Sequence, residues 1–239
     1  MCGRYASGSS VDELVEEFDV EQVLPGVPGP SWNVAPTDVV RAVVERRAAQ
    51  GASGVRSLVP MRWGLVPFWA EGTAGAARLI NARGETAADK PSFRAAYRRR
   101  RCLLPADGYY EWQKLGQRKQ PWFIHRQDNR QLAMAGLWET WVDRELPEDH
   151  PDRFVVTCTI LTTAATDALG HVHDRMPMTV RSDAWAAWLD RDLQDPEEIA
   201  GLLVPDPGQD ITSHPVAAAV GKVSNNFPGL VDPVALPGE

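Results

Sequence analysis

The sequence predicts an α+β fold in which a mostly antiparallel, barrel-like β-sheet is surrounded by peripheral helices. Strand-like apolar runs follow one another along the 239 residues without the alternating crossover helices that a parallel sheet needs. No internal repeat and no long linker interrupts the sequence. We therefore expect residues 1–239 to form a single domain, and we expect neither a Rossmann nor a TIM arrangement.

The first predicted element is an amphipathic helix over residues 11–20. Ser10 and Glu13 have the spacing of a capping box, and apolar residues follow them at helical intervals. The stretch LPGVPGP at residues 24–30 then ends the pattern, because proline and glycine break regular structure.

Strands are predicted where β-branched and aromatic residues are dense. The first two are residues 38–47 and 55–66, with a turn at 48–54 between them. A short strand at 78–82 leads into a helix near 90–100. A β-meander is predicted at residues 101–114, 120–127 and 131–141, with turns at 115–119 and 128–130, followed by a strand at 153–163. The last helices are predicted at residues 182–190 and 195–204.

Composition limits the classes of function. Hydrophobic residues make up 44% and charged residues 24%, which is typical of globular proteins. No signal peptide and no membrane-spanning apolar run is present in the sequence, so we expect a cytoplasmic protein. Cys2, Cys102 and Cys158 are far apart, which predicts neither a disulfide framework nor a zinc site. No cofactor is indicated, and His171 and His173 lack the further ligands of a metal site.

The charge distribution is uneven. The formal net charge of −7 argues weakly against nucleic-acid binding. A local field matters more to a ligand than the net charge does, however. Residues 78–101 contain only Glu85 and Asp89 as acidic residues, against the basic residues Arg78, Arg83, Lys90, Arg94, Arg98, Arg99, Arg100 and Arg101.

Cys2 stands directly after Met1. Because cysteine is small, we expect the methionine to be removed. The mature chain would then begin with a free α-amine and a thiol on the same residue, which together form a bifunctional nucleophile.

Three further polar residues lie within or beside apolar or aromatic runs, where burial is costly unless the group is paired or functional. Asn81 follows an apolar pair, Glu111 has aromatic residues on both sides, and His173 precedes the stretch DRMP. Taken singly, each has a simpler interpretation: Asn81 as a turn or cap residue, Glu111 as a strand residue that faces water, and His173 as a loop histidine. With Cys2 they suggest a nucleophile with a carboxylate base, a histidine and a polarising amide.

Aromatic and basic residues near these positions suggest a binding surface. Trp63, Phe68 and Trp69 lie in a stretch that contains proline and glycine, and aromatic rings stack on the bases of single-stranded or distorted DNA. Arg4, Arg83 and Arg175 each lie two residues from Cys2, Asn81 and His173, respectively. The alternative is a hydrophobic core with ordinary surface arginines.

The ordered set of motifs along the chain closely resembles the SOS-response-associated peptidase (SRAP) family. The motifs are MCGRY (1–5), NVAPT (33–37), RWGLVPFW (62–69), NARGET (81–86), RCLLPADGYYEW (101–112), HVHDRMP (171–177) and SHPVAAAVGKVSNN (213–226). The resemblance implies the SRAP fold and a sensor that shields abasic sites in single-stranded DNA. It also implies that the α-amine of the N-terminal cysteine forms a Schiff base with the ring-opened sugar, after which the thiol closes a thiazolidine ring. The result is a covalent DNA–protein crosslink.

The resemblance also assigns roles to individual residues. Glu111 would shuttle the proton of the amine, His173 would assist opening of the sugar ring and reversal of the link, and Asn81 would hydrogen-bond the cysteine or the sugar. The functional residues that it implies are Cys2, Asn81, Glu111 and His173. The DNA contacts that it implies are Arg4, Asn33, Pro36, Phe68, Trp69, Arg83, Thr162 and Arg175.

Other functions remain open at this stage. The family name implies self-cleavage where a leader precedes the cysteine, and an N-terminal-nucleophile peptidase or amidase is one alternative. A non-covalent single-stranded-DNA-binding module is another. We expect a monomer that acts on DNA containing abasic sites, with replication-fork proteins as further partners and no membrane association.

Overall fold

The computed structural model describes residues 2–46, 54–165, 172–203 and 211–236. Met1, His171 and nearly all of the turn predicted at 48–54 lie outside these residues. In the described part of the chain, no helix combines the length and the apolar character needed to cross a membrane.

A closed barrel forms the centre of the fold and confirms the predicted α+β class. Its strands are hydrogen bonded in the order β11–β10–β7–β4–β5, and β5 pairs with β11 to close the ring. All neighbours are antiparallel except β5 and β11, which are parallel where Trp63 faces Cys158. The barrel strands are β4 (Val39–Arg46), β5 (Val55–Trp63), β7 (Arg101–Ala106), β10 (Leu132–Val142) and β11 (Phe154–Ala164).

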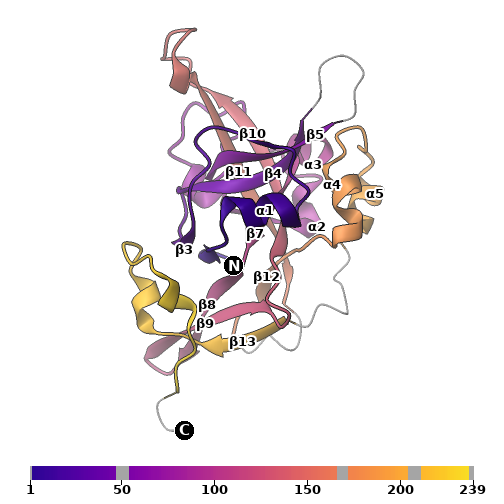
Figure 1. Cartoon of the computed structure of the whole chain (residues 1–239). Coiled ribbons are helices and arrows are strands. Elements are labelled where there is room, and N and C mark those ends of the chain that lie inside the picture. The colour runs from indigo at the N-terminus through magenta and orange to yellow at the C-terminus, as the bar shows by residue number, and fades with distance from the viewer. Residues whose placement is uncertain (1, 47–53, 166–171, 204–210, 237–239) are drawn as a thin grey trace.

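A second antiparallel sheet lies against the barrel. Its order is β13–β9–β8–β1–β3, and Figure 1 shows β8, β9 and β13 grouped below the barrel strands. Its strands are β1 (Tyr5–Ser7), β3 (Ser31–Val34), β8 (Gly108–Leu115), β9 (Arg118–Arg126) and β13 (Ile211–Pro215). Short strands extend the barrel sheet, namely β2 (Gln22–Val23), β6 (Asn81–Arg83) and β12 (Arg175–Pro177).

The period-two pattern of the strands places successive residues of one strand in different hydrophobic clusters. Along β4, Val40, Ala42 and Val44 pack with the cluster that contains Cys2, whereas Val43 packs with the cluster that contains the helices. The helices are α1 (Val11–Glu17), α2 (Gly84–Ala87), α3 (Arg94–Arg99), α4 (Trp185–Leu189) and α5 (Pro196–Gly201). Further 3-10 turns lie at Ala76–Arg78, Pro151–Arg153, Ser182–Ala184, Ala218–Gly221 and Pro228–Val231.

The predicted meander is wrong in its connections. Residues 101–114 form two strands, β7 and β8, which belong to different sheets, and β10 pairs with β7 and β11 rather than with β9. The chain changes sheet at Asp107, whose N–H donates to the carbonyl of Ala6. Gly108 then approaches β9 so closely that a Cβ would lie 2.5 Å from the carbonyl oxygen of Ile124. The β8–β9 hairpin itself agrees with the prediction.

The predicted first helix is shorter than its apolar pattern. The capping box forms as expected, with the side chain of Ser10 accepting from the N–H of Glu13. The helix ends at Glu17, and Asp19 follows with a φ of 51°, a left-handed conformation that stops helical hydrogen bonding.

Candidate active site

Pairing between β1 and β8 brings the start of the chain beside Glu111. Tyr5 faces Tyr109 in this antiparallel pair, and the N–H of Tyr110 donates to the carbonyl of Arg4 over 2.9 Å. The charge of Glu111 acts on the Cys2 thiol, so the two side chains lie near each other. Cys2 is fully buried and Glu111 is 5% exposed, so both groups lie in an environment of low polarity.

Asn81 reaches the same place from the barrel. It begins β6, which runs parallel to β11 with Asn81 opposite Ile160. Its Nδ2 donates to the carbonyl oxygen of Cys2 over 2.8 Å. Its Oδ1 is buried and has no hydrogen-bond partner within the described residues. This oxygen can therefore accept a hydrogen bond from a bound ligand.

The carboxyl group of Glu111 has a strongly raised pKa. Burial raises its pKa to about 7, the negative charge of Asp174 adds to the rise, and the positive amino terminus of the chain opposes it. A carboxyl group with this pKa exchanges protons readily at neutral pH, which suits a general acid or base.

His173 lies just before β12 and its side chain is about one-third exposed. Its Nδ1 lies 2.7 Å from Oδ1 of Asp174 and accepts from the N–H of Arg175 over 3.1 Å. Burial lowers the pKa of His173, the amino terminus lowers it further, and Asp174 opposes both effects. Because the amino terminus acts on the pKa of both His173 and Glu111, both side chains lie near the start of the chain.

The thiol of Cys2 is protonated in this environment. Burial raises its pKa, and the charge of Glu111 raises it further. Its Sγ lies 4.0 Å from the carbonyl oxygen of Arg4. A buried neutral thiol is a weak nucleophile until a base removes its proton.

Arg175 and Arg83 lie on the two strands that flank β11, and their electrostatic settings differ. Arg175 forms a bidentate ion pair with Glu85, at 2.7 and 2.9 Å, and also donates to the carbonyl of Thr162 over 2.6 Å. Arg83 is exposed. Arg175 lowers the pKa of Glu85 chiefly through the hydrogen bond, and the charge of Arg83 contributes to the same shift. Sequence reasoning missed Glu85 as a partner of this site.

Arg4 and Asn33 hold the C-terminal segment, residues 218–226, beside the site. Nη1 of Arg4 donates to Oδ1 of Asn33 over 2.8 Å and to the carbonyl of Val220 over 2.9 Å. Asn33 is 3% exposed, and its Nδ2 lies 2.7 Å from the carbonyl oxygen of Asn225 and 3.1 Å from that of Lys222. This pair therefore ties the C-terminal segment to β3 and to the residue before β1.

The other expected DNA contacts differ in accessibility. Phe68 and Trp69 are 58% and 56% exposed, which is unusual for large apolar side chains. Pro36 is half-buried, whereas Thr162 is 1% exposed in the middle of the sheet between Arg83 and Pro177. The structure thus presents the aromatic pair to solvent but covers Thr162.

The basic segment 78–101 is not one continuous surface. Arg101 is 3% exposed and ties α3 to α4 through hydrogen bonds to backbone carbonyls, including that of Trp188 at 2.6 Å. Arg100 forms an ion pair of 2.6 Å with Glu139. Arg100 and Arg101 therefore support the fold, whereas Arg83, Arg94, Arg98 and Arg99 are exposed, and Arg83 is the one among them that lies on the same strand as Asn81.

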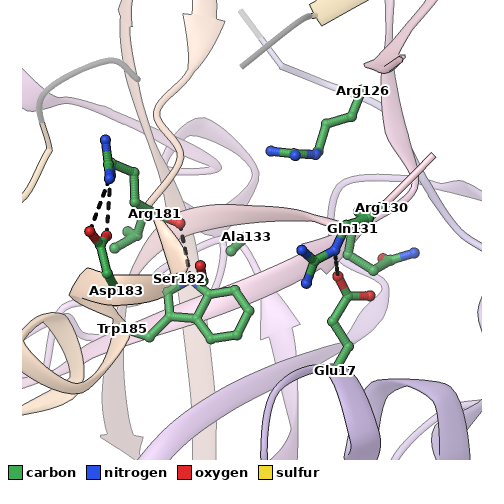
Figure 2. Close-up of a pocket in the computed structure, with 10 residues that line it drawn as sticks. Glu17, Arg126, Arg130, Gln131, Ala133, Arg181, Ser182, Asp183 and Trp185 are labelled. Carbon is green, nitrogen blue, oxygen red and sulfur yellow. Dashed lines mark hydrogen bonds and ion pairs between the residues drawn. The ribbon is translucent and has the colours of Figure 1, made fainter. Parts of the chain in front are cut away.

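A separate pocket of about 240 Å³ lies between β9, β10 and the turn before α4. Figure 2 shows the guanidinium groups of Arg126 and Arg130 on one side and the indole of Trp185 at its base. Arg130 pairs with Glu17 at 3.4 Å. None of the site residues named above is among those lining this pocket.

Within the residues that the structure describes, no group of three or more His, Cys, Asp or Glu side chains is arranged to hold a metal ion.

Comparison with known proteins points to one family. The family model described as SOS response associated peptidase (SRAP) matches residues 1–223. The chain is 36% identical over 234 residues to abasic site processing protein YoqW of Bacillus subtilis (strain 168), covering 97% of this chain and 99% of that protein. It is 34% identical over 242 residues to abasic site processing protein YedK of Escherichia coli (strain K12), covering 98% and 100%. A solved structure from Bacteroides thetaiotaomicron has a TM-score of 0.83 at 23% identity, covering 98% of this chain and 100% of that one, and shares the fold.

Proposed function

Because the chain belongs to the SOS response associated peptidase (SRAP) family, we propose that it processes abasic sites in DNA by linking them covalently to Cys2. Its relatives YoqW and YedK are named abasic site processing proteins. One observation carries the proposal: Asn81 holds the carbonyl of Cys2 at 2.8 Å beside a buried Glu111 whose pKa is about 7.

The reaction joins an aldehyde to an amine and a thiol without any redox change. The α-amine of Cys2 attacks the C1′ aldehyde of the ring-opened deoxyribose, and one water leaves as the imine forms. The thiol sulfur then bonds to the imine carbon, and the thiol proton ends on the nitrogen, which closes a thiazolidine. The mechanism requires a chain that begins at Cys2, since only a free α-amine can close this five-membered ring.

The site residues divide the proton transfers. An α-amine with a pKa of about 7.7–8.0 is partly neutral at cellular pH. Glu111 accepts the proton that the amine loses and relays it to the departing water. His173 donates a proton to the ring oxygen of the closed sugar as it opens, and Asn81 orients Cys2 and accepts a hydrogen bond from the opened sugar.

The exposed aromatic pair favours single-stranded DNA as the substrate. Bases of a single strand can stack on Phe68 and Trp69 without the cost of opening a duplex. We propose that the protein acts as a monomer at such sites near replication forks, in the cytoplasm and on the nucleoid.

The test is a crosslinking experiment with a single-stranded oligonucleotide that contains one abasic site. A band that survives denaturation, with the mass of protein plus DNA minus one water, is the expected result. Intact-mass measurement of the protein alone should show a chain that begins at Cys2.

Matched cysteine variants control for folding. Cys2→Ser should give only a labile imine that borohydride traps, while Cys158→Ser should crosslink as the wild type does. DNA binding without any covalent product would indicate the non-covalent module instead. Turnover of a peptide or amide without DNA capture would indicate the peptidase or amidase, and self-cleavage is to be sought in chains with a leader before Cys2.

A further inference from the structure

We propose that Trp141 and Thr157 are positioning residues that hold Phe68 and Trp69 as a rigid stacking platform for DNA bases. The proposal rests on the proposed function, because it concerns how the same DNA is held during the reaction. Neither Trp141 nor Thr157 is among the residues expected to touch DNA.

The platform is a tight turn. The N–H of Ala70 donates to the carbonyl of Pro67 over 2.9 Å, which places Phe68 and Trp69 at the two central positions. Both rings are more than half exposed, at 58% and 56%, and therefore offer their faces to a ligand.

A buried side chain of the barrel anchors each flank of this turn. On the incoming side, the N–H of Val66 donates to Oγ1 of Thr157 over 2.9 Å, and Thr157 is fully buried. On the outgoing side, Nε1 of Trp141 donates to the carbonyl of Ala70 over 2.7 Å, and Trp141 is 6% exposed. Trp141 lies on β10 and Thr157 on β11, both long strands of the barrel. Because the turn is hydrogen bonded to both strands, we expect it to be as rigid as the barrel.

The turn belongs to a loop over residues 64–79, and the two ends of this loop are in contact with each other. Gly64 has a φ of 127°, and a Cβ there would lie 2.7 Å from the carbonyl oxygen of Ala76, so only glycine fits. The N–H of Leu65 donates to the carbonyl of Leu79 over 3.2 Å. The chain then leaves the loop directly into Asn81, so the platform and the residue that holds Cys2 form one connected unit.

Rigid anchoring explains how exposed aromatic rings can bind a single strand efficiently. A mobile loop would lose conformational entropy when it bound DNA, and that loss would weaken affinity. A turn that is already fixed avoids this loss. Trp141 and Thr157 should therefore affect how tightly DNA binds and not how fast Cys2 reacts once an aldehyde is in place.

Two conservative variants isolate this role. Trp141→Phe keeps the buried ring and removes the indole N–H, and Thr157→Val keeps the shape and removes the acceptor. Each should raise the DNA concentration for half-maximal crosslinking about 2- to 10-fold, the effect of losing one hydrogen bond. The rate at saturating DNA, and the rate of thiazolidine formation with free 2-deoxyribose, should match the wild type.

The matched control is Trp185→Phe. Trp185 is also a buried tryptophan whose Nε1 donates to a carbonyl, that of Val180 at 2.9 Å, but it packs on Phe18 away from the platform. This variant should show an unchanged half-maximal DNA concentration. A double-mutant cycle gives the second control: in a Phe68→Ala, Trp69→Ala background, Trp141→Phe should have no further effect on that concentration.

The outcomes separate the inference from the proposed function. If the wild type reacts with 2-deoxyribose but does not crosslink abasic DNA, the proposed function fails. If the wild type crosslinks DNA and Trp141→Phe behaves like Trp185→Phe, or if its effect persists without the platform, the positioning role is overturned.

Discussion

At the scale of single residues, burial bears on the order of steps in the proposed mechanism. Burial raises the pKa of the Cys2 thiol, which fits a sequence in which the α-amine reacts first and the thiol follows. The thiol proton must leave as the carbon–sulfur bond forms, and Glu111, with a pKa of about 7, is suited to receive it. Burial thus raises the pKa of both groups, the thiol that we propose as a nucleophile and the carboxyl group that we propose as its base.

The first prediction concerns this base. Glu111→Gln keeps the shape of the side chain and removes the proton acceptor, so single-turnover crosslinking should slow about 10²- to 10⁴-fold. DNA affinity, measured separately with an oligonucleotide that lacks the abasic site, should not change. A loss of affinity as large as the loss of rate would mean that Glu111 is a binding or structural residue.

A parallel prediction applies to His173. His173→Gln removes a group that titrates near neutrality, so opening of the sugar ring and release of the crosslink should both slow. The finished crosslink should persist longer than that of the wild type when a competing abasic oligonucleotide is added. Faster release in the variant would contradict the role assigned to the imidazole.

Glu111 also makes stability depend on pH. The ordinary pKa of its carboxyl group is 4.5, and burial raises it to about 7 in the folded protein. Protonated Glu111 is therefore favoured in the folded protein. Its contribution to the free energy of unfolding is fully present below pH 4.5, the unfolded pKa, and is lost as the pH rises through about 7, the folded pKa. Between about pH 4 and pH 8, Glu111→Gln should gain up to about 3 kcal/mol in unfolding free energy relative to the wild type. Denaturant titrations at both pH values measure this gain, and an equal difference at both would refute it.

At the scale of elements, the C-terminal segment depends on Asn33. Its amide lies against the carbonyls of Val220, Lys222 and Asn225, and its Oδ1 accepts from Arg4. Asn33→Ala should therefore cost about 2–3 kcal/mol of stability and increase amide hydrogen exchange in residues 218–226. Reduced DNA affinity with unchanged stability and exchange would instead make Asn33 a direct DNA contact.

The sequence predicted long elements better than short ones. Strands β4 and β5 lie within predicted segments, and β9, β10 and β11 exceed theirs by only one or two end residues, because each carries enough alternating apolar residues to be recognised. β1, β3 and β12 are three or four residues long and depend on pairing with distant strands, which no local pattern reveals. The sequence did not predict the break between β7 and β8. Asp107 alone separates the two strands, and apolar residues resume directly after Gly108, so the segment looks like one continuous strand.

The candidate site shows the same division. Polar residues in apolar surroundings make Asn81, Glu111 and His173 candidates, and the resemblance to the SRAP family adds the roles expected of them. The partners that set their environment, such as Asp174 for Glu111 and Glu85 for Arg175, follow only from the fold. A residue's own chemistry can be read locally, but its neighbours across the sheet cannot.

At the scale of the whole molecule, barrel closure assembles the site. The parallel contact of β5 with β11 brings Trp63, at the start of the platform loop, beside Cys158. β11 then continues between β6 and β12, so Asn81 and Arg175 come from opposite neighbours of one strand. Segments that are distant in sequence therefore meet at the end of the chain that carries Cys2.

The overall charge of the molecule leads to the last prediction. The chain has a formal net charge of −7, so DNA binding must depend on local positive charge. Arg175 is bound by Glu85 through two hydrogen bonds in the free protein, which cancels much of its field. Glu85→Gln should release this charge, strengthen binding of single-stranded DNA, and steepen the dependence of log Kd on log salt by up to about 0.7.

Two arginine variants complete the test, which measures affinity across a salt series. Arg83→Gln should weaken binding and flatten the salt dependence by about 0.7, because an exposed phosphate contact is lost. Arg175→Gln should have a smaller effect in the wild type than in the Glu85→Gln background, because only there is its charge unopposed. If Glu85→Gln instead weakens DNA binding, this prediction is wrong. Glu85 would then orient Arg175 toward the phosphate and would not reduce DNA affinity.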